Sequence, residues 1–231
     1  MRNKKTLLYL VVLTLGFILS GCSATKPMTK GEAYPKMYEE QPRSLLILPP
    51  MNESTDAEAK DYYMTTTEMP FALMGYYTFP SEMVSDIMKQ EGIYDTELLY
   101  GLPMNKFYEY FGADAVLMTK IRKWDVAYAV VASTLTVVIE AKIVSTKTSE
   151  VLWAYVGAIK VNLGGDGNTN GGLAGLLVQA VITAVATASA DYVTYAHKAN
   201  AQIIHSLPAG PYSEQYMLDE SQVLLPYGQE P

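Results

Sequence analysis

The chain has 231 residues, of which 49% are hydrophobic, and it carries 17 basic and 24 acidic side chains. This composition is that of a globular protein rather than a disordered one. The acidic excess argues against a nucleic-acid-binding protein, because phosphate backbones attract basic surfaces. Cys22 is the only cysteine, which excludes internal disulfides and clusters of metal-binding thiolates.

The first residues have the three parts of a secretory signal. A basic start (Arg2, Lys4, Lys5) precedes the apolar run Leu7–Leu19, which is shorter than the roughly 20 residues of a membrane span. The next residues, Leu19-Ser20-Gly21-Cys22, resemble the lipobox of bacterial lipoproteins. In that class the cysteine thiol carries a diacylglycerol, a peptidase cuts before it, and its amino group is acylated. We therefore predict a signal peptide over residues 1–21 and lipidation of Cys22.

The residue after the cysteine is Ser23 rather than aspartate. By the sorting rule of lipoproteins in enteric bacteria, this favours the outer membrane. Several acyl chains would anchor the protein firmly, because each buried CH₂ contributes about 0.8 kcal/mol. Residues 22–43 are polar and contain three prolines, so we predict a lipidated flexible tether there.

The domain predicted over residues 44–206 begins with Ser44–Leu48, an apolar run typical of a strand buried on both faces of a sheet. Met51–Thr67 is polar and poorly periodic, so we expect a loop. Residues 80–92 predict a helix, and residues 103–111 predict another that ends at Gly112. Their expected inward side chains are Met83, Val84, Ile87 and Met88 in the first helix, and Phe107, Tyr110 and Phe111 in the second.

Strand character returns over residues 113–121. Two further strands, residues 128–144 and 151–163, flank a short polar turn and predict an antiparallel hairpin. An apolar stripe from Leu173 to about His205 predicts one long helix, and residues 207–231 read as an extended tail. The predicted fold class is α/β, with a mixed β-sheet flanked by helices and a long C-terminal helix.

The long predicted helix has two interpretations. No charged residue occurs from Gly167 to Ala190, so a membrane span is one alternative. The segment is rich in Ala, Thr and Ser, and its apolar residues form a stripe, so we favour a buried helix of a soluble domain. Small residues on its other face leave room for a partner helix and predict a partner or oligomer surface: Thr183, Ala186, Thr187 and Ala190.

No motif predicts catalysis, a metal site or a cofactor. Asp166–Gly171 matches the first half of a calcium loop, but Leu177 stands where a bidentate glutamate is needed. A glycine-asparagine turn explains the same residues. His197 and His205 are eight residues apart, which is not the i, i+4 spacing of a helical metal pair. The chain has no phosphate-binding glycine motif and no marked nucleophile.

Three segments together resemble a known family. Ser44–Ser54 is similar to the opening strand, Pro and Asn-x-Ser of curli-secretion-type and TolB amino-terminal-type domains. Gly112–Leu117 resembles their Gly-Ala-Asp step before a strand, and Ile143–Ala154 resembles their Lys-Thr-Gly-Glu-Val-Leu-Trp hairpin, with Ser149 in place of glycine. The chain is most similar to outer-membrane lipoproteins of unknown function typified by a meningococcal candidate antigen. The resemblance implies a mixed sheet flanked by helices and no catalytic residues.

The first functional hypothesis is a non-enzymatic outer-membrane lipoprotein that acts through protein partners, as an accessory to envelope assembly or secretion. Those partners would be other copies of the chain or other envelope lipoproteins, and not nucleic acid. A second hypothesis is a pore-forming or transport component in which Gly164–Ala190 enters the membrane. A third is a binder of glycans or small ligands through the aromatic stretch Tyr62–Phe79.

Overall fold

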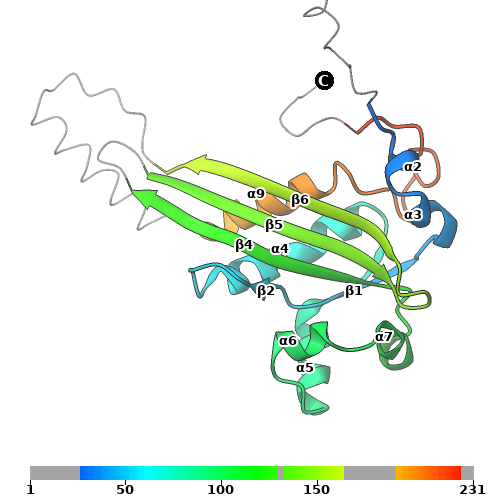
Figure 1. The fold of residues 1–231 in the computed structure, drawn as a ribbon, viewed down its shortest axis with the longest axis horizontal. Coiled ribbons are helices and arrows are strands. Elements are labelled where there is room, and N and C mark those ends of the chain that lie inside the picture. The colour runs from blue at the N-terminus through cyan, green and yellow to red at the C-terminus, as the bar shows by residue number, and fades with distance from the viewer. Residues whose placement is uncertain (1–26, 129–132, 164–190, 225–231) are drawn as a thin grey trace, which may run out of the picture.

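The computed structural model describes residues 27–128, 133–163 and 191–224. Its six-stranded sheet has the order β3-β1-β4-β5-β6, and β2 pairs with β4 (Figure 1). The pairs β3–β1, β1–β4 and β2–β4 are parallel, whereas β5 is antiparallel to both of its neighbours, β4 and β6. The strands are β1 (Ser44–Ile47), β2 (Met51–Asn52), β3 (Tyr77–Phe79), β4 (Ala115–Tyr128), β5 (Ser133–Ser145) and β6 (Val151–Asn162). The mixed sheet and the β5–β6 hairpin are thus confirmed.

Strand β1 lies inside the sheet and is covered on both faces. Leu45 and Ile47 point into one apolar core, while Leu46 and Leu48 point into another. All four side chains are buried. A strand in this position needs an apolar residue at every position, not at alternate ones. This explains why its run is uninterrupted.

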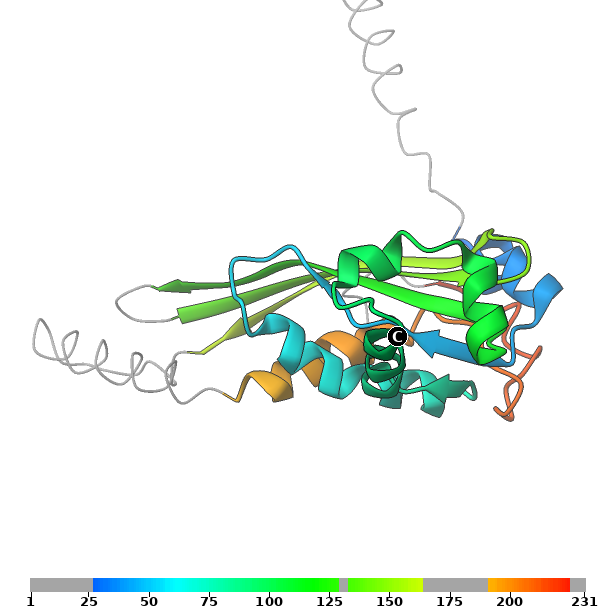
Figure 2. The same ribbon diagram turned by 90° about the horizontal axis from the view of Figure 1, so that it is seen from below.

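Helices cover the two faces unequally. Helices α4 (Ala59–Leu73) and α9 (Tyr192–Ile203) pack side by side, and Figure 2 shows them as a layer beneath the long strands. Their core includes Phe71, Trp124 and Trp153. Among the described helices, those on the other face lie near β1; they are α5 (Ser81–Gln90), α6 (Thr96–Tyr100) and α7 (Met104–Phe111).

Helices α5 and α7 confirm two predicted elements. Gly112 ends α7 with a positive φ of 67°, in the left-handed region that glycine tolerates best. Of the expected inward residues, Val84, Met88 and Phe107 are buried, but Met83 and Tyr110 are exposed. Both helices lie at the rim of the smaller core, so only a narrow stripe of each is covered.

The loop predicted over Met51–Thr67 is wrong, because this stretch contains β2 and most of α4. The buried residues of α4 do have helical spacing: Ala59, Tyr63, Thr66, Thr67, Pro70 and Phe71. Three of these six are threonine or proline, which are poor helix formers and hide the periodicity. The hydroxyls of Thr66 and Thr67 bond back to the carbonyl of Tyr63, at 3.0 and 2.9 Å, which allows their burial.

The C-terminal helix is confirmed as α9, but it begins later than predicted. Asp191 has an extended backbone, and its carboxylate accepts the amide proton of Val193 at 3.1 Å, which caps α9. A single helix running through Asp191 is therefore wrong. Residues 164–190 lie outside the described residues, and so do the predicted surface residues Thr183, Ala186, Thr187 and Ala190.

The predicted tether and tail are wrong over the residues that the structure describes. Residues 30–40 form two short helices, α2 (Lys30–Ala33) and α3 (Pro35–Glu40). Met37 and Tyr38 of α3 are buried, as are Leu207 and Ala209 in the expected tail. Thr29 and Glu32 form a capping box at the start of α2, and Pro35 occupies the first turn of α3. Both are local signals of a helix start in this polar stretch.

Candidate functional site

Residues 28–31 and 207–224 bind each other at one end of the molecule, and we call this pair of segments the clasp. Figure 1 shows the blue start of the described chain beside its red end. The amide of Lys30 donates to the carbonyl of Gln222 at 2.9 Å, and that of Leu224 donates to Met28 at 2.8 Å. Thr29 and Val223 form an antiparallel β-bridge. The ends of the domain are therefore fixed to each other by main-chain pairing.

A buried ion pair lies at the centre of the clasp. The Lys30 ammonium is 3.1 Å from a carboxylate oxygen of Asp219, and their side chains are only 5% and 6% exposed. The ammonium also donates to the carbonyl of Leu207 at 2.9 Å. The Asp219 carboxylate accepts from the Tyr38 hydroxyl at 3.1 Å and from the Ala209 amide at 2.9 Å. Two buried charges are tolerated here because several hydrogen bonds accompany the pair.

Burial, together with the nearby Asp219 charge, raises the pKa of the Tyr38 phenol well above its ordinary value. This hydroxyl therefore stays protonated and donates its hydrogen bond. Asp219 thus binds both Lys30 of the other clasp segment and Tyr38 of α3. These contacts hold the two segments together, so the role of this group is structural.

Glycines allow the C-terminal segment to approach helix α4. Gly75 has φ of 88°, and a Cβ there would lie 2.4 Å from the backbone nitrogen of Ser213. A Cβ on Gly210 would lie 2.3 Å from the carbonyl oxygen of Gly75. The amide of Tyr212 donates to that same carbonyl at 2.9 Å. The two backbones are in direct contact here. A side chain at either glycine would therefore displace the C-terminal segment from the end of α4.

A hollow of about 580 Å³ opens beside the clasp. Its polar lining comes mainly from amides and hydroxyls, and its apolar lining from Met74, Ile204 and Leu218; the remaining lining residues are Lys30, His205, Ala209, Ser213, Gln215, Asp219, Ser221 and Gln222. Its two buried charges, Lys30 and Asp219, are already paired with each other. The hollow could hold a small polar molecule, but it presents no arranged acid, base or nucleophile.

The Gly112-Ala113-Asp114 step contacts the Thr-Lys turn of the β5–β6 hairpin, so two of the recognised motifs form one junction. Asp114 accepts from the Arg43 amide at 3.0 Å, from the Ser44 hydroxyl at 3.2 Å and from the Lys147 ammonium at 3.0 Å. Burial raises the pKa of this carboxyl, but these bonds outweigh burial and hold the pKa below its ordinary value. Asp114 thus joins the start of β1 to the hairpin.

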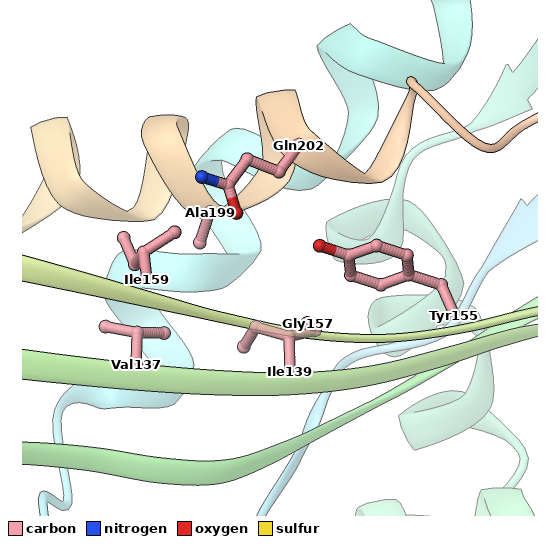
Figure 3. A pocket seen from close by; sticks show the side chains of 7 residues that line it. All are labelled: Val137, Ile139, Tyr155, Gly157, Ile159, Ala199 and Gln202. Atoms are coloured by element: carbon pink, nitrogen blue, oxygen red, sulfur yellow. The ribbon is translucent and has the colours of Figure 1, made fainter. Parts of the chain in front are cut away.

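A second polar group lies between the sheet and the helices, and Figure 3 shows three of its residues, Tyr155, Gly157 and Gln202. We call Tyr63, Tyr155, Gly157, Asn200 and Gln202 the helix–sheet layer. A Cβ on Gly157 would lie 1.8 Å from the Tyr155 hydroxyl, so the ring occupies the space of a missing side chain. Among the described residues, Tyr63 Oη, Asn200 Oδ1 and Gln202 Oε1 are buried without a hydrogen-bond partner.

Strand β6 is the last strand of the sheet, and no described strand pairs with its outer edge. Helix α3 covers its beginning, where the Tyr34 hydroxyl donates to the carbonyl of Ala154 at 3.4 Å. Further along, Val156 is 73% exposed. An edge strand presents a row of N–H and C=O groups, which makes it a template for another strand.

Several predicted sites lie outside the described residues, namely Cys22 and the Asp166–Gly171 loop. His197 and His205 are exposed and separate, on α9 and just after it. No group of His, Cys, Asp and Glu able to hold a metal ion occurs within residues 27–128, 133–163 and 191–224. Over the same part of the chain, no helix has the length and apolar character for crossing a bilayer.

The aromatic stretch Tyr62–Phe79 divides between the core and the surface, where Tyr77 is 57% exposed. Tyr63, Phe71 and Tyr76 are buried, and the Tyr62 ring stacks on Tyr192 with centroids 5.5 Å apart. Tyr62, Tyr63 and Phe71 belong to the core beneath the sheet because α4, unrecognised in the sequence, turns them inward. The residues that sequence reasoning missed are Lys30 and Asp219, and no local pattern around either predicts their contact.

Comparison with known proteins gives a consistent result. The model of the family described as "Putative lipoprotein GNA1162-like" matches residues 33–211. "Putative lipoprotein NMB1124/NMB1162" of Neisseria meningitidis serogroup B (strain ATCC BAA-335 / MC58) is 31% identical over 173 residues, which are 75% of this chain and 78% of that protein.

Solved structures are similar as well. The crystal structure of lipoprotein GNA1162 from Neisseria meningitidis matches with a TM-score of 0.51 and 32% identity, over 63% of this chain and 99% of that chain. A PelC dodecamer from Paraburkholderia phytofirmans matches with a TM-score of 0.42 and 9% identity, over 72% and 89%. A likeness at that second level says nothing about assembly. The family model covers well over half of the sequence, so the chain belongs to the GNA1162-like lipoprotein family.

Proposed function

We propose that the protein is a non-enzymatic lipoprotein of the outer membrane, anchored through lipid on Cys22 after removal of residues 1–21. It acts through protein partners, as an accessory to envelope assembly or secretion. Membership of a lipoprotein family supports the anchor, as does the motif Leu19-Ser20-Gly21-Cys22. The clasp supports a non-enzymatic role, because its buried charged groups are used for holding the fold together.

The observation that carries the partner role is the outer edge of β6, with which no described strand pairs. Val156 is among its exposed side chains, and Ala154, Ala158 and Lys160 are exposed beside it. The partner we propose is a strand of another protein chain, either a second copy or another envelope lipoprotein, that extends the sheet. A long edge strand without proline and with a single lysine is suited to such pairing. Thr183, Ala186, Thr187 and Ala190 remain a second proposed partner surface.

The anchor is tested by mass spectrometry of the protein purified from membranes. We expect the N-terminal peptide to start at Cys22 and to carry diacylglycerol and an amide-linked acyl chain. The Cys22→Ser variant should lack this mass and leave the membrane fraction. An unmodified Cys22 in a membrane-bound protein would contradict the proposed anchor.

The partner surface is tested with a photo-crosslinking amino acid at Val156, in intact cells. The matched control carries it at Leu98 of α6, which is also exposed but lies away from β6. We expect a discrete protein adduct at Val156 that is absent at Leu98. Adducts of equal yield at both positions, or none at Val156, would contradict the edge as a partner surface.

The pore alternative is tested by solubility. A chain without residues 1–22 lacks the signal and the anchor but keeps Gly164–Ala190. If that segment enters a membrane, the shortened chain should need detergent, whereas the accessory role expects it to stay in solution without detergent.

A further inference from the structure

The clasp changes how far the domain can stand from its anchor. A tether that continued to Arg43 would allow about 75 Å between the lipidated cysteine and the domain. Instead, Met28 is already held by main-chain pairing with Leu224. The six residue steps from Cys22 to Met28 can span at most about 22 Å. Given the proposed lipidation, the clasp end must therefore lie close to the membrane surface.

The same end presents exposed apolar side chains. Leu218 is 70% exposed, Met28 is 54% exposed, and Val223 and Met217 are also exposed. Val223 is bridged to Thr29, and Leu218 lines the same hollow as Lys30. All of them lie on the two clasp segments. We call these four residues, Met28, Met217, Leu218 and Val223, the foot.

We propose that the foot contacts the lipid surface to which Cys22 is attached, and so fixes which end of the domain faces the membrane. The proposal rests on the lipid anchor of the proposed function. The contact is apolar rather than electrostatic, because Lys30, the basic side chain of the two clasp segments, is buried and paired with Asp219. Glu214 and Glu220 are exposed on the same segments, which suits a zwitterionic headgroup layer and not an anionic one.

The opposite end of the sheet then points away from the anchor. Figure 1 shows the long strands β4, β5 and β6 running from the clasp side to the far end of the molecule. Apolar side chains at an interface gain free energy when they leave water, and the nearby anchor raises their effective concentration at the surface. A few exposed side chains are therefore enough to orient a domain that would not bind vesicles without its anchor.

The test uses the mature chain, residues 22–231. Because Cys22 is the only cysteine, it can be coupled to a maleimide lipid in phosphatidylcholine vesicles without any cellular lipidation. Hydrogen–deuterium exchange is then compared between the coupled protein and the free protein mixed with plain vesicles. We expect slower exchange in peptides covering 27–31 and 211–224, and no change in the far ends of β4 and β5. High salt should leave this protection in place, and its loss in salt would contradict an apolar contact.

Two double variants test whether the protection depends on the foot. Leu218→Glu combined with Val223→Glu should abolish the protection. The matched control, Tyr94→Glu combined with Leu98→Glu, changes two exposed residues near α6 and should keep it. Circular dichroism and thermal unfolding confirm that both variants fold, which is expected because all four positions are exposed. Equal exchange of coupled and free protein, or protection at the far end of the sheet, would overturn the proposal.

The outcome is separable from that of the proposed function. If Cys22 carries no lipid in cells, the proposed anchor fails, yet the chemically coupled protein still reports whether the foot meets the bilayer. If Cys22 is lipidated but the coupled protein shows no protection, only the foot is wrong.

Discussion

The clasp and the helix–sheet layer both place polar side chains inside the protein, but they treat them differently. In the clasp, Asp219 binds both Lys30 and Tyr38 of α3, and Lys30 and Asp219 also bind nearby backbone groups. In the helix–sheet layer, Tyr63 and Gln202 each have a buried oxygen without a hydrogen-bond partner among the described residues. An unpaired buried polar group costs about 1–3 kcal/mol. Specific pairing therefore holds the clasp, whereas apolar burial under α4 and α9 must hold the layer.

The largest expected effect is at the centre of the clasp. Asp219→Ala leaves the Lys30 ammonium buried without its counter-ion, and we expect a loss of about 3–5 kcal/mol in the free energy of unfolding. Urea denaturation of the chain lacking residues 1–22 measures this loss.

A matched double variant separates charge burial from packing. Lys30→Met combined with Asp219→Leu removes both charges. It should recover part of the stability, because no unpaired charge remains, although the Tyr38 hydroxyl and the Ala209 amide still lose their acceptor. If Asp219→Ala alone cost less than about 1 kcal/mol, the pair would behave as a surface pair. The distinction between the clasp and the layer would then fail.

The second-largest loss of stability is expected in the helix–sheet layer. Gly157→Ala places a methyl group 1.8 Å from the Tyr155 hydroxyl, so the ring must move within a packed interior. We expect a loss of about 1–3 kcal/mol. The variant Tyr155→Ala removes the clash, so the two changes together should cost less than the sum of their separate costs. Additive costs in urea denaturation would show that the ring does not fill the space over Gly157.

The Asp114 carboxylate is paired with a lysine, as Asp219 is in the clasp. It lies, however, at the partly exposed junction of β1 and the hairpin. Its folded pKa is lowered, so its contribution is present above the unfolded pKa of about 3.9 and is lost as pH falls through the folded pKa. Asp114→Asn should lower stability at neutral pH by about 1.5 kcal/mol. The difference between the two proteins should shrink towards zero in acid. A difference in urea midpoint that stays constant down to low pH would contradict this.

The smallest expected effect gives the most direct comparison of the two regions. The same substitution, Tyr→Phe, should lower the free energy of unfolding at one site and raise it at the other. Tyr38→Phe removes a hydroxyl that donates to Asp219 and should cost about 1 kcal/mol. Tyr63→Phe removes a buried hydroxyl with no hydrogen-bond partner among the described residues and should gain up to about 1 kcal/mol. Thermal unfolding of both variants shows whether each substitution lowers or raises the stability. Equal losses would mean that the Tyr63 hydroxyl is satisfied in solution.

The elements that could be predicted from the sequence are those whose burial or boundaries follow from the order of neighbouring residues. β1 is apolar at each of its central positions because both of its faces are covered. α7 ends at a glycine that takes a positive φ, and β5 and β6 flank a polar turn. In contrast, α4 was missed because Thr66, Thr67 and Pro70 occupy half of its buried stripe.

The candidate site could not be predicted for a different reason. Residues 22–43 have the composition of a tether, and three prolines there favour extended chain. Lys30 meets Asp219 across 189 residues of sequence, and either residue alone would be assigned to the surface. The local helix signals in this segment are the Thr29–Glu32 capping box and Pro35 in the first turn of α3.

The sequence by itself thus determined the family, the central strand, the hairpin and the expectation of a lipid on Cys22. Each of these depends on neighbouring residues or on a short motif. The tertiary structure alone decided that the predicted tether and tail bind each other at one end of the domain. A charged side chain can be buried only where a partner from elsewhere in the chain compensates its lost hydration, and that partner becomes visible only once the chain has folded.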